Sequence, residues 1–381
     1  MAKPDRTWFW PWLSELVQSK TEDIRLQMFR TLELSALLEI YGPNERSIVA
    51  QEWLIHDAEN GDFSRIKMLG QELRAPYPFL QLLTDKSLEP AWPQLEEVAG
   101  PNLQKIADAN IIKSAAAYNA NPDDRQAFNF YVQALGFAGK FEEAIGLVRT
   151  FDHSPEAMLN AAEDDLWAII IEALALDALG RHGEAEAVFD AVAALPFEGE
   201  RKFWLHHFII NRASRLVNMG QWQKGLDATM LAHQVAEQEE VAQYEEGLSW
   251  QKMAIRTARI CALVNLGRQA EAAPLLTEAY ERREDGYASA ARAYLCAGND
   301  DKAAAIVLEA LDNPDHQDDM ALNLQKIDLE IFYVPETLPS LRDRLRSRPE
   351  IDAAFNKIAR DLPDRLIPVA SLRRRQIAQA K

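Results

Sequence analysis

The sequence predicts an all-α fold built from antiparallel helix hairpins, and three observations indicate it. A glycine follows an apolar helical stretch five times, and a small residue stands five positions after each glycine. Between residues 24 and 40, apolar side chains recur at the spacing of three to four residues that is typical of a helix. No stretch of the sequence shows the strict alternation of apolar and polar residues that predicts a β-strand.

The glycine motif has a physical explanation. Glycine readily adopts the positive φ that ends a helix, and a small residue five positions later allows the second helix to cross the first closely. An apolar residue also stands four positions before each glycine. The glycine and small-residue pairs are Gly139 and Ala144, Gly180 and Ala185, Gly220 and Gly225, Gly267 and Ala272, and Gly298 and Ala303. We expect a helix to end at each glycine and another to begin within a few residues.

These motifs resemble the tetratricopeptide repeat over roughly residues 122–314, where Asn121-Pro122 and Asn313-Pro314 resemble the proline that ends a repeat. The glycines are 41, 40, 47 and 31 residues apart, whereas the family repeats regularly at about 34. The resemblance implies a right-handed superhelical solenoid of hairpins, whose first helices line a concave inner face.

The predicted organisation has three parts. Residues 1–100 form an N-terminal helical region, either a degenerate repeat or a cap, and residues 101–315 form about five helix pairs. Residues 316–381 form capping helices with a basic tail. Residues 84–102 hold three prolines and are expected to be a linker. Two short helices that are separated at Pro349 are expected to cover the last apolar face, because a solenoid needs caps.

Charge and hydropathy limit the class of protein. The formal net charge is -18; residues 336–381 carry 11 basic and 6 acidic residues, or +5, so residues 1–335 carry -23. This excess disfavours nucleic acid as the main partner and favours a basic or neutral protein segment. No apolar run reaches the ~20 residues of a membrane-spanning helix. We expect a cytoplasmic protein, or a periplasmic or secreted one if a signal peptide was removed.

No catalytic or metal-binding motif stands out. His206 and His207 are adjacent, so their side chains point about 100° apart on a helix and chelate poorly together. Cys261 and Cys296 lack metal-site spacing and are expected to be thiols in a reducing compartment. We therefore expect no metal, no cofactor and no enzymatic activity. The aromatic residues 8–12 are expected to cap the first helix, and the arginines at 373–375 to form a frayed, solubilising end.

The predicted function is that of a scaffold or adaptor that binds a protein or peptide in the concave groove. Two alternatives remain: an obligate structural subunit of a larger assembly, and a helical-repeat enzyme or small-ligand receptor. Glu172 and Arg212 occupy equivalent positions in successive first helices and are expected to pair. Helical spacing back from each glycine nominates the groove residues, which are Gln126, Asn129, Gln133, Phe137, Trp167, Ile170, Asp177, His207, Ser214, Asn218, Thr257, Asn265 and Arg292.

Overall fold

The computed structural model describes residues 43–73, 76–195, 202–236, 245–325 and 337–379. Throughout these residues the regular elements are helices, apart from one isolated β-bridge between Asp85 and Ala359. The all-α prediction is confirmed for this part of the chain. The expected helix over residues 24–40 and the aromatic residues 8–12 lie outside it. None of the described helices is long and apolar enough to cross a membrane.

The chain divides into two compact units, residues 1–74 and residues 75–381. The division lies well before the expected boundary at residue 100. In the first unit, α4 (Pro43–Glu59) packs against α5 (Ile66–Glu72). The Arg65 Nη2 and Asp57 Oδ1 atoms lie 2.5 Å apart, and Arg65 also stacks over the ring of Trp53 at 4.7 Å. An ion pair and a cation–π contact thus join the two helices.

The second unit begins with helices that include the expected linker. Residues 84–102 are not a linker, because they form short helices whose Leu95 and Ala99 side chains are fully buried. Pro93 and Pro101 stand in the first turns of α7 and η2, where a helix tolerates proline, and Pro90 lies inside η1. The elements are α6 (Pro76–Thr84), η1 (Lys86–Ala91), α7 (Trp92–Ala99), η2 (Pro101–Leu103) and α8 (Gln104–Ala120).

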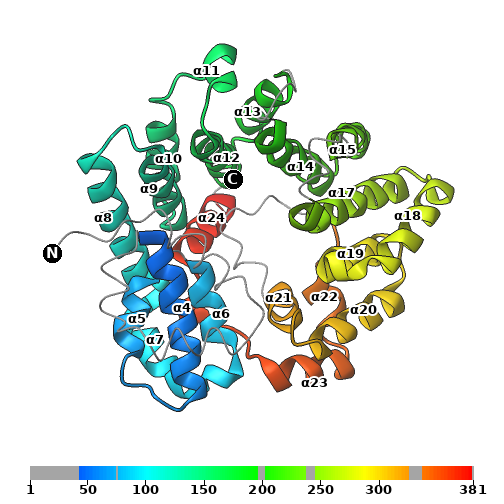
Figure 1. The fold of residues 1–381 in the computed structure, drawn as a ribbon. Helices are drawn as coiled ribbons and strands as arrows, with labels where there is room; N and C mark the ends of the chain where they lie inside the picture. Colours follow the sequence, from blue (N-terminus) through cyan, green and yellow to red (C-terminus); the bar gives the residue numbers. More distant parts are fainter. Residues whose placement is uncertain (1–42, 74–75, 196–201, 237–244, 326–336, 380–381) are drawn as a thin grey trace. The chain divides into compact units, whose positions relative to one another are not determined.

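Five helix hairpins follow, each turning at one of the predicted glycines (Figure 1). All five glycines have φ between 69° and 76°, which confirms the prediction. The hairpins are α9 (Arg125–Phe137) with α10 (Phe141–Val148), α12 (Glu163–Ala178) with α13 (His182–Ala193), α14 (Lys202–Asn218) with α15 (Trp222–Ala236), α17 (Glu245–Asn265) with α18 (Gln269–Glu281), and α19 (Tyr287–Cys296) with α20 (Asp300–Asp312). Shorter helices α11 (Pro155–Leu159), η3 (Arg283–Asp285) and α21 (Gln317–Asn323) stand between or after them.

The turns repeat the same hydrogen bonds. At the first turn, the Lys140 N–H donates to the Leu135 carbonyl and the Gly139 N–H donates to the Gly136 carbonyl, which is the Schellman arrangement. Equivalent pairs occur at the other four glycines. The small residues are buried as expected. At Gly225, a Cβ atom would lie only 2.5 Å from a methyl carbon of Val217, so only glycine allows α15 to approach α14 this closely.

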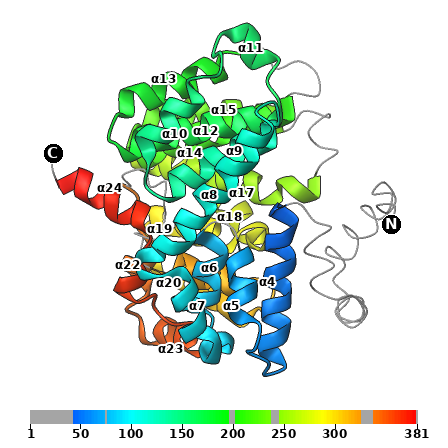
Figure 2. The same cartoon turned by 90° about the vertical axis from the view of Figure 1, so that its left-hand side faces the viewer.

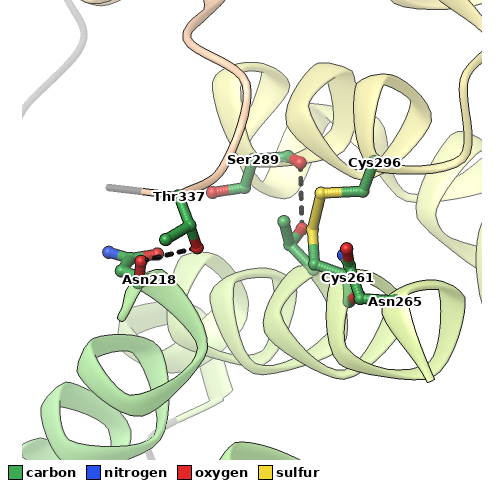
Figure 3. Close-up of a disulfide and its surroundings, with 7 residues drawn as sticks. Asn218, Cys261, Asn265, Ser289, Cys296 and Thr337 are labelled. Carbon is green, nitrogen blue, oxygen red and sulfur yellow. Dashed lines mark hydrogen bonds between the residues drawn. A yellow bond between two sulfur atoms is a disulfide. The ribbon is translucent and has the colours of Figure 1, made fainter. Parts of the chain in front are cut away.

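Neighbouring hairpins pack through their first helices. Helix α12 contacts both α9 and α14, and α17 contacts α14 and α19. A disulfide joins Cys261 of α17 to Cys296 of α19, with the two Cα atoms 5.2 Å apart (Figure 3). The expectation that both cysteines are thiols is therefore wrong: residues far apart in sequence occupy adjacent first helices, which spacing alone does not reveal. The bond adds a covalent tie between the last two hairpins.

The C-terminal residues return along the second unit. They form α22 (Leu341–Leu345), α23 (Pro349–Ile358), η5 (Asp364–Leu366) and α24 (Val369–Gln379), so the predicted break at Pro349 is confirmed. In both views α22 and α23 lie beside α20 (Figures 1 and 2). The Arg360 N–H donates to the Thr84 carbonyl at 2.8 Å, and η5 contacts η2. The start and end of the second unit are therefore in direct contact.

The predicted basic tail is a packed helix rather than a frayed end. Ser371 of α24 is fully buried and Arg374 is 8% exposed. The Ala370 Cα atom lies 3.1 Å from the place where a Cβ on Gly139 would stand. Helix α24 therefore packs directly on the turn between α9 and α10, where only a hydrogen on Gly139 leaves room for its backbone.

Candidate binding face

The first helices α9, α12 and α14 each have one partly exposed stripe. On α9 the stripe follows positions i, i+4, i+7 and i+11, which lie on one side of a helix. Helices α9 and α14 both pack against α12, and each first helix also packs against its own second helix, so the three stripes stand on neighbouring helices. We call the three stripes together the inner face; its residues are Gln126, Phe130, Gln133 and Phe137 of α9, Trp167 and Leu174 of α12, and Asn211, Ser214 and Asn218 of α14.

Six of the predicted groove residues belong to this face: Gln126, Gln133, Phe137, Trp167, Ser214 and Asn218. Gln126 is exposed, and the others are partly exposed. Amide and hydroxyl groups donate and accept hydrogen bonds, and the indole combines a large apolar area with an N–H donor. The side chains thus have the chemistry to bind the backbone and apolar side chains of a polypeptide.

Four other predicted groove residues are buried inside the protein. Asn129 is 3% exposed and donates through Nδ2 to Asp164 at 2.9 Å, while its Oδ1 accepts from Gln133. Ile170 lies in the core between the first two hairpins. The Thr257 hydroxyl donates to the Ser289 carbonyl at 2.9 Å. These side chains join helices to one another and are not available to a partner.

Asp177, the fourth, forms the most buried ion pair among the described residues. The Arg215 Nε and Nη2 atoms donate to its two carboxylate oxygens at 2.5 and 2.8 Å, and both side chains are at most 2% exposed. His182 Nδ1 lies 2.9 Å from Asp177 Oδ1, and the His182 carbonyl accepts from Arg215 Nη2. Removing one partner of such a pair leaves a buried charge, so Asp177 is a structural residue that ties α12 to α14.

The three remaining predicted groove residues are not counted in the inner face. The Asn265 amide donates to the Cys261 carbonyl one turn earlier on α17, beside the disulfide (Figure 3). Arg292 is partly buried on α19. The side chain of His207 is outside the described part of the structure. The inner face as defined above takes in the first three hairpins, while Asn265 is exposed on α17 and Arg292 is partly exposed on α19.

The expected pair between Glu172 and Arg212 does not form. Arg149 Nε donates to Glu172 Oε1 at 2.7 Å, and Arg212 Nε donates to Asp190 Oδ1 at 2.8 Å. Both charged residues of the first helices therefore turn toward second helices, because α10 and α13 supply closer partners. Glu172 and Arg212 therefore each form an ion pair with a residue other than the one predicted.

The C-terminal segment borders the inner face at two places. Asn218 ends α14, and its carbonyl accepts from the Thr337 N–H at 2.8 Å and from the Thr337 hydroxyl at 3.0 Å (Figure 3). Phe137 and Ile377 both pack against the buried cluster that holds Phe141, Leu176 and Ala370. One edge of the inner face is thus covered by the chain's own C-terminal residues.

Within the described ranges, no group of three or more His, Cys, Asp or Glu side chains is placed to hold a metal ion. Comparisons with protein-family models, with curated proteins and with solved structures gave no match.

Proposed function

We propose that this protein is a scaffold or adaptor that binds a segment of another protein on the inner face. The observation that carries the proposal is the shared stripe of amide, hydroxyl and aromatic side chains on α9, α12 and α14. Such a mixture suits an extended peptide, since amides bind its backbone and aromatic rings cover its apolar side chains. We also propose that the hairpins form a tetratricopeptide-like, right-handed solenoid that presents this face.

The partner segment is proposed to be basic or neutral. The chain carries a formal charge of -18, so an acidic partner would be repelled and would associate slowly. Salt screens charges, and the Debye length, beyond which two exposed charges hardly interact, is ~8 Å at physiological ionic strength. Affinity for a basic segment should therefore fall as salt is added, whereas binding dominated by the aromatic and amide groups should change little.

Affinity capture from a native lysate, compared between wild type and face variants, tests the proposal. The variant combines Gln126→Ala, Trp167→Leu and Ser214→Ala, one change on each first helix; leucine keeps an apolar side chain against the core. The control combines Gln269→Ala and Glu281→Ala, which are exposed on α18. We expect the face variant to lose at least tenfold in affinity for the captured protein, and the control to bind as wild type does.

Circular dichroism verifies that both variants are folded. Full binding by the folded face variant would refute the inner face as the site. Failure to purify the protein except as part of a fixed complex would instead favour the alternative of an obligate structural subunit.

The disulfide supports the periplasmic or secreted alternative for localisation. Disulfides persist in oxidising compartments and are rare in the cytosol, and Cys261, which forms one half of the bond, is fully buried. We propose an oxidising compartment for this chain. Mass spectrometry after alkylation of the purified protein in denaturant, without reductant, checks this, because denaturant exposes the buried Cys261: two alkylated thiols would contradict it.

A further inference from the structure

A pocket of about 310 Å³ lies in the second unit between α10, α11, α12 and α13. Its volume is at the lower end of the ~300–1,000 Å³ that small-ligand pockets occupy. It lies apart from the inner face, because Glu184 and three further lining residues belong to the second helix α13. The lining residues are Arg149, His153, Met158, Ile169, Glu172, Glu184, Ala187, Val188 and Ala191.

Glu172 is the polar group that this pocket leaves incompletely bonded. Its side chain is 1% exposed, and its Oε1 atom accepts from Arg149. Its Oε2 atom is buried without a hydrogen-bond partner, and the Nδ1 atom of His153 stands 3.7 Å away, beyond hydrogen-bond distance. The Nε2 atom of His153 is also buried without a hydrogen bond. A buried carboxylate oxygen without a donor is costly, so this position favours a ligand that donates a hydrogen bond.

The second carboxylate of the pocket is already satisfied. Arg181 donates to both oxygens of Glu184 at 2.6 and 2.7 Å, and Arg149 donates to it at 3.3 Å. The hydrogen bond from Arg181 is the main cause that lowers the pKa of Glu184 to about 2. Arg149 therefore spans Glu172 and Glu184 and is held in place by both, which leaves Glu172 Oε2 as the carboxylate oxygen of the pocket that has no hydrogen-bond donor.

The charge of the pocket selects among donors. Two carboxylates and one guanidinium line it, and the guanidinium of Arg181 pairs with Glu184 from outside the lining. The preference for a cation therefore comes from the whole chain, whose formal charge of -18 attracts a cation and repels an anion. The remaining walls are aliphatic: Met158, Ile169, Ala187, Val188 and Ala191. A short hydrocarbon chain fits these walls, and burying it is favourable.

We propose that this pocket binds a small primary amine in its protonated form. The ammonium group donates to Glu172 Oε2, and the aliphatic chain packs against the α13 alanines and against Met158 and Ile169. A charge-assisted hydrogen bond to a buried carboxylate is roughly twice as strong as a neutral one. The amine should therefore bind more tightly than an alcohol of the same length.

The test measures the binding of n-butylammonium, n-butanol and n-butyrate to the full chain by ligand-observed saturation-transfer NMR titrations. The pocket is filled by the double variant Ala187→Leu/Ala191→Leu, which leaves Glu172 unchanged. Its control is Ala270→Leu/Ala273→Leu, two exposed alanines on α18. We expect wild type and control to bind n-butylammonium at least tenfold more tightly than the other two probes, and the filled variant to lose at least tenfold.

A second variant, Glu172→Gln, tests the acceptor itself and should abolish the preference for the amine over the alcohol. Circular dichroism establishes that each variant is folded. The proposal is overturned if wild type gives no saturation transfer to n-butylammonium, if n-butyrate binds equally well, or if the folded filled variant binds the amine as wild type does.

Discussion

The five hairpins and the C-terminal residues 337–379 are both helical, but they are held in place differently. Each hairpin turn is fixed by residues that are neighbours in sequence, such as Lys140 and Leu135. The C-terminal segment instead binds parts of the chain that are remote in sequence: Thr337 contacts Asn218, and Arg360 contacts Thr84. Local determinants can be recognised in a sequence, whereas this return path depends on the assembled surface of the second unit.

The two regions also differ in charge, and basic residues of the C-terminal segment form ion pairs with acidic residues elsewhere in the chain. Arg344 and Arg348 of the C-terminal segment pair with Asp300 and Asp301 at the start of α20, both with shortest distances of 2.6–2.7 Å. Arg365 pairs with Glu96 at 2.5 Å. The positive charge of residues 336–381 thus helps to dock the segment on the acidic body. Each exposed pair contributes only ~0–1 kcal/mol, so apolar burial must supply most of the docking energy.

The largest expected effect comes from removing that apolar burial. Phe355 of α23 is fully buried in the cluster that also holds Ile306 and Val307 of α20, and Arg346 stacks on its ring at 3.9 Å. Phe355→Ala should lower the free energy of unfolding by about 3–5 kcal/mol. The matched change in a hairpin is Phe189→Ala, since Phe189 is 1% exposed and Phe355 is 0% exposed.

Urea denaturation followed by circular dichroism measures both changes. If the C-terminal segment and the hairpins form one folding unit, both variants shift a single transition. A separate early transition in the Phe355 variant alone would contradict a shared core and would make the segment an independently detachable element.

A smaller effect on stability is expected at the hairpin turns. It can be measured by comparing a turn on which the C-terminal segment packs with a turn on which it does not. Gly139 and Gly267 have φ of 71° and 76°, a conformation that costs a residue with a Cβ roughly 1–2 kcal/mol. Nothing lies within 4 Å of a Cβ placed on Gly267, whereas one on Gly139 would meet the backbone of Ala370 at 3.1 Å. Gly267→Ala should cost only the backbone strain, and Gly139→Ala should cost more.

Thermal unfolding of the two alanine variants measures the difference. A larger loss at Gly139 indicates that α24 is docked in solution as the structure has it. Equal losses at the two glycines would show that α24 does not press on the first turn.

The same contrast explains which parts of the structure the sequence predicts. The turns are predictable because Gly, the preceding apolar residue and the following small residue act within ten positions of one another. The inner face is predicted in part: Asn129 and Ile170 are predicted groove residues, but both side chains are buried in contacts between helices. Positions three and four residues apart share one side of a helix, so the spacing back from a glycine does not separate the exposed residues of a stripe from the neighbours that pack against the next helix.

The remaining errors involve partners that only the fold brings together. The ion pair of Asp177 with Arg215 and the disulfide of Cys261 with Cys296 join residues 38 and 35 positions apart. The packing of α24 on the first hairpin joins residues more than two hundred positions apart. Sequence spacing predicts none of these three contacts. No periodic pattern specifies where a returning segment docks, because many residues form the surface on which it docks.

The smallest expected effect concerns the contact between α21 and the start of the second unit, where two carboxylates lie near each other. Burial and the nearby carboxylate of Asp85 raise the pKa of Asp318 on α21, with a smaller contribution from Asp319; a hydrogen bond with Gln81 acts in the opposite direction. Because its pKa is raised on folding, the folded state binds this proton more tightly than the unfolded state does. The carboxylate therefore destabilises the fold at neutral pH, and the penalty disappears as the pH falls through the folded pKa toward the ordinary value of 3.8.

Asp318→Asn should therefore raise the free energy of unfolding at pH 7, and its advantage over wild type should shrink as the pH approaches 4. Urea denaturation at the two pH values measures this, with Asp315→Asn, an exposed neighbour in the preceding turn, as the control that should differ little from wild type at either pH. An advantage that persists unchanged at pH 4 would mean that the asparagine acts through hydrogen bonding rather than by removing charge. Destabilisation at pH 7 would instead mean that the Asp318 carboxylate has a favourable partner. Helix α21 and the start of the second unit would then attract rather than repel each other at this contact.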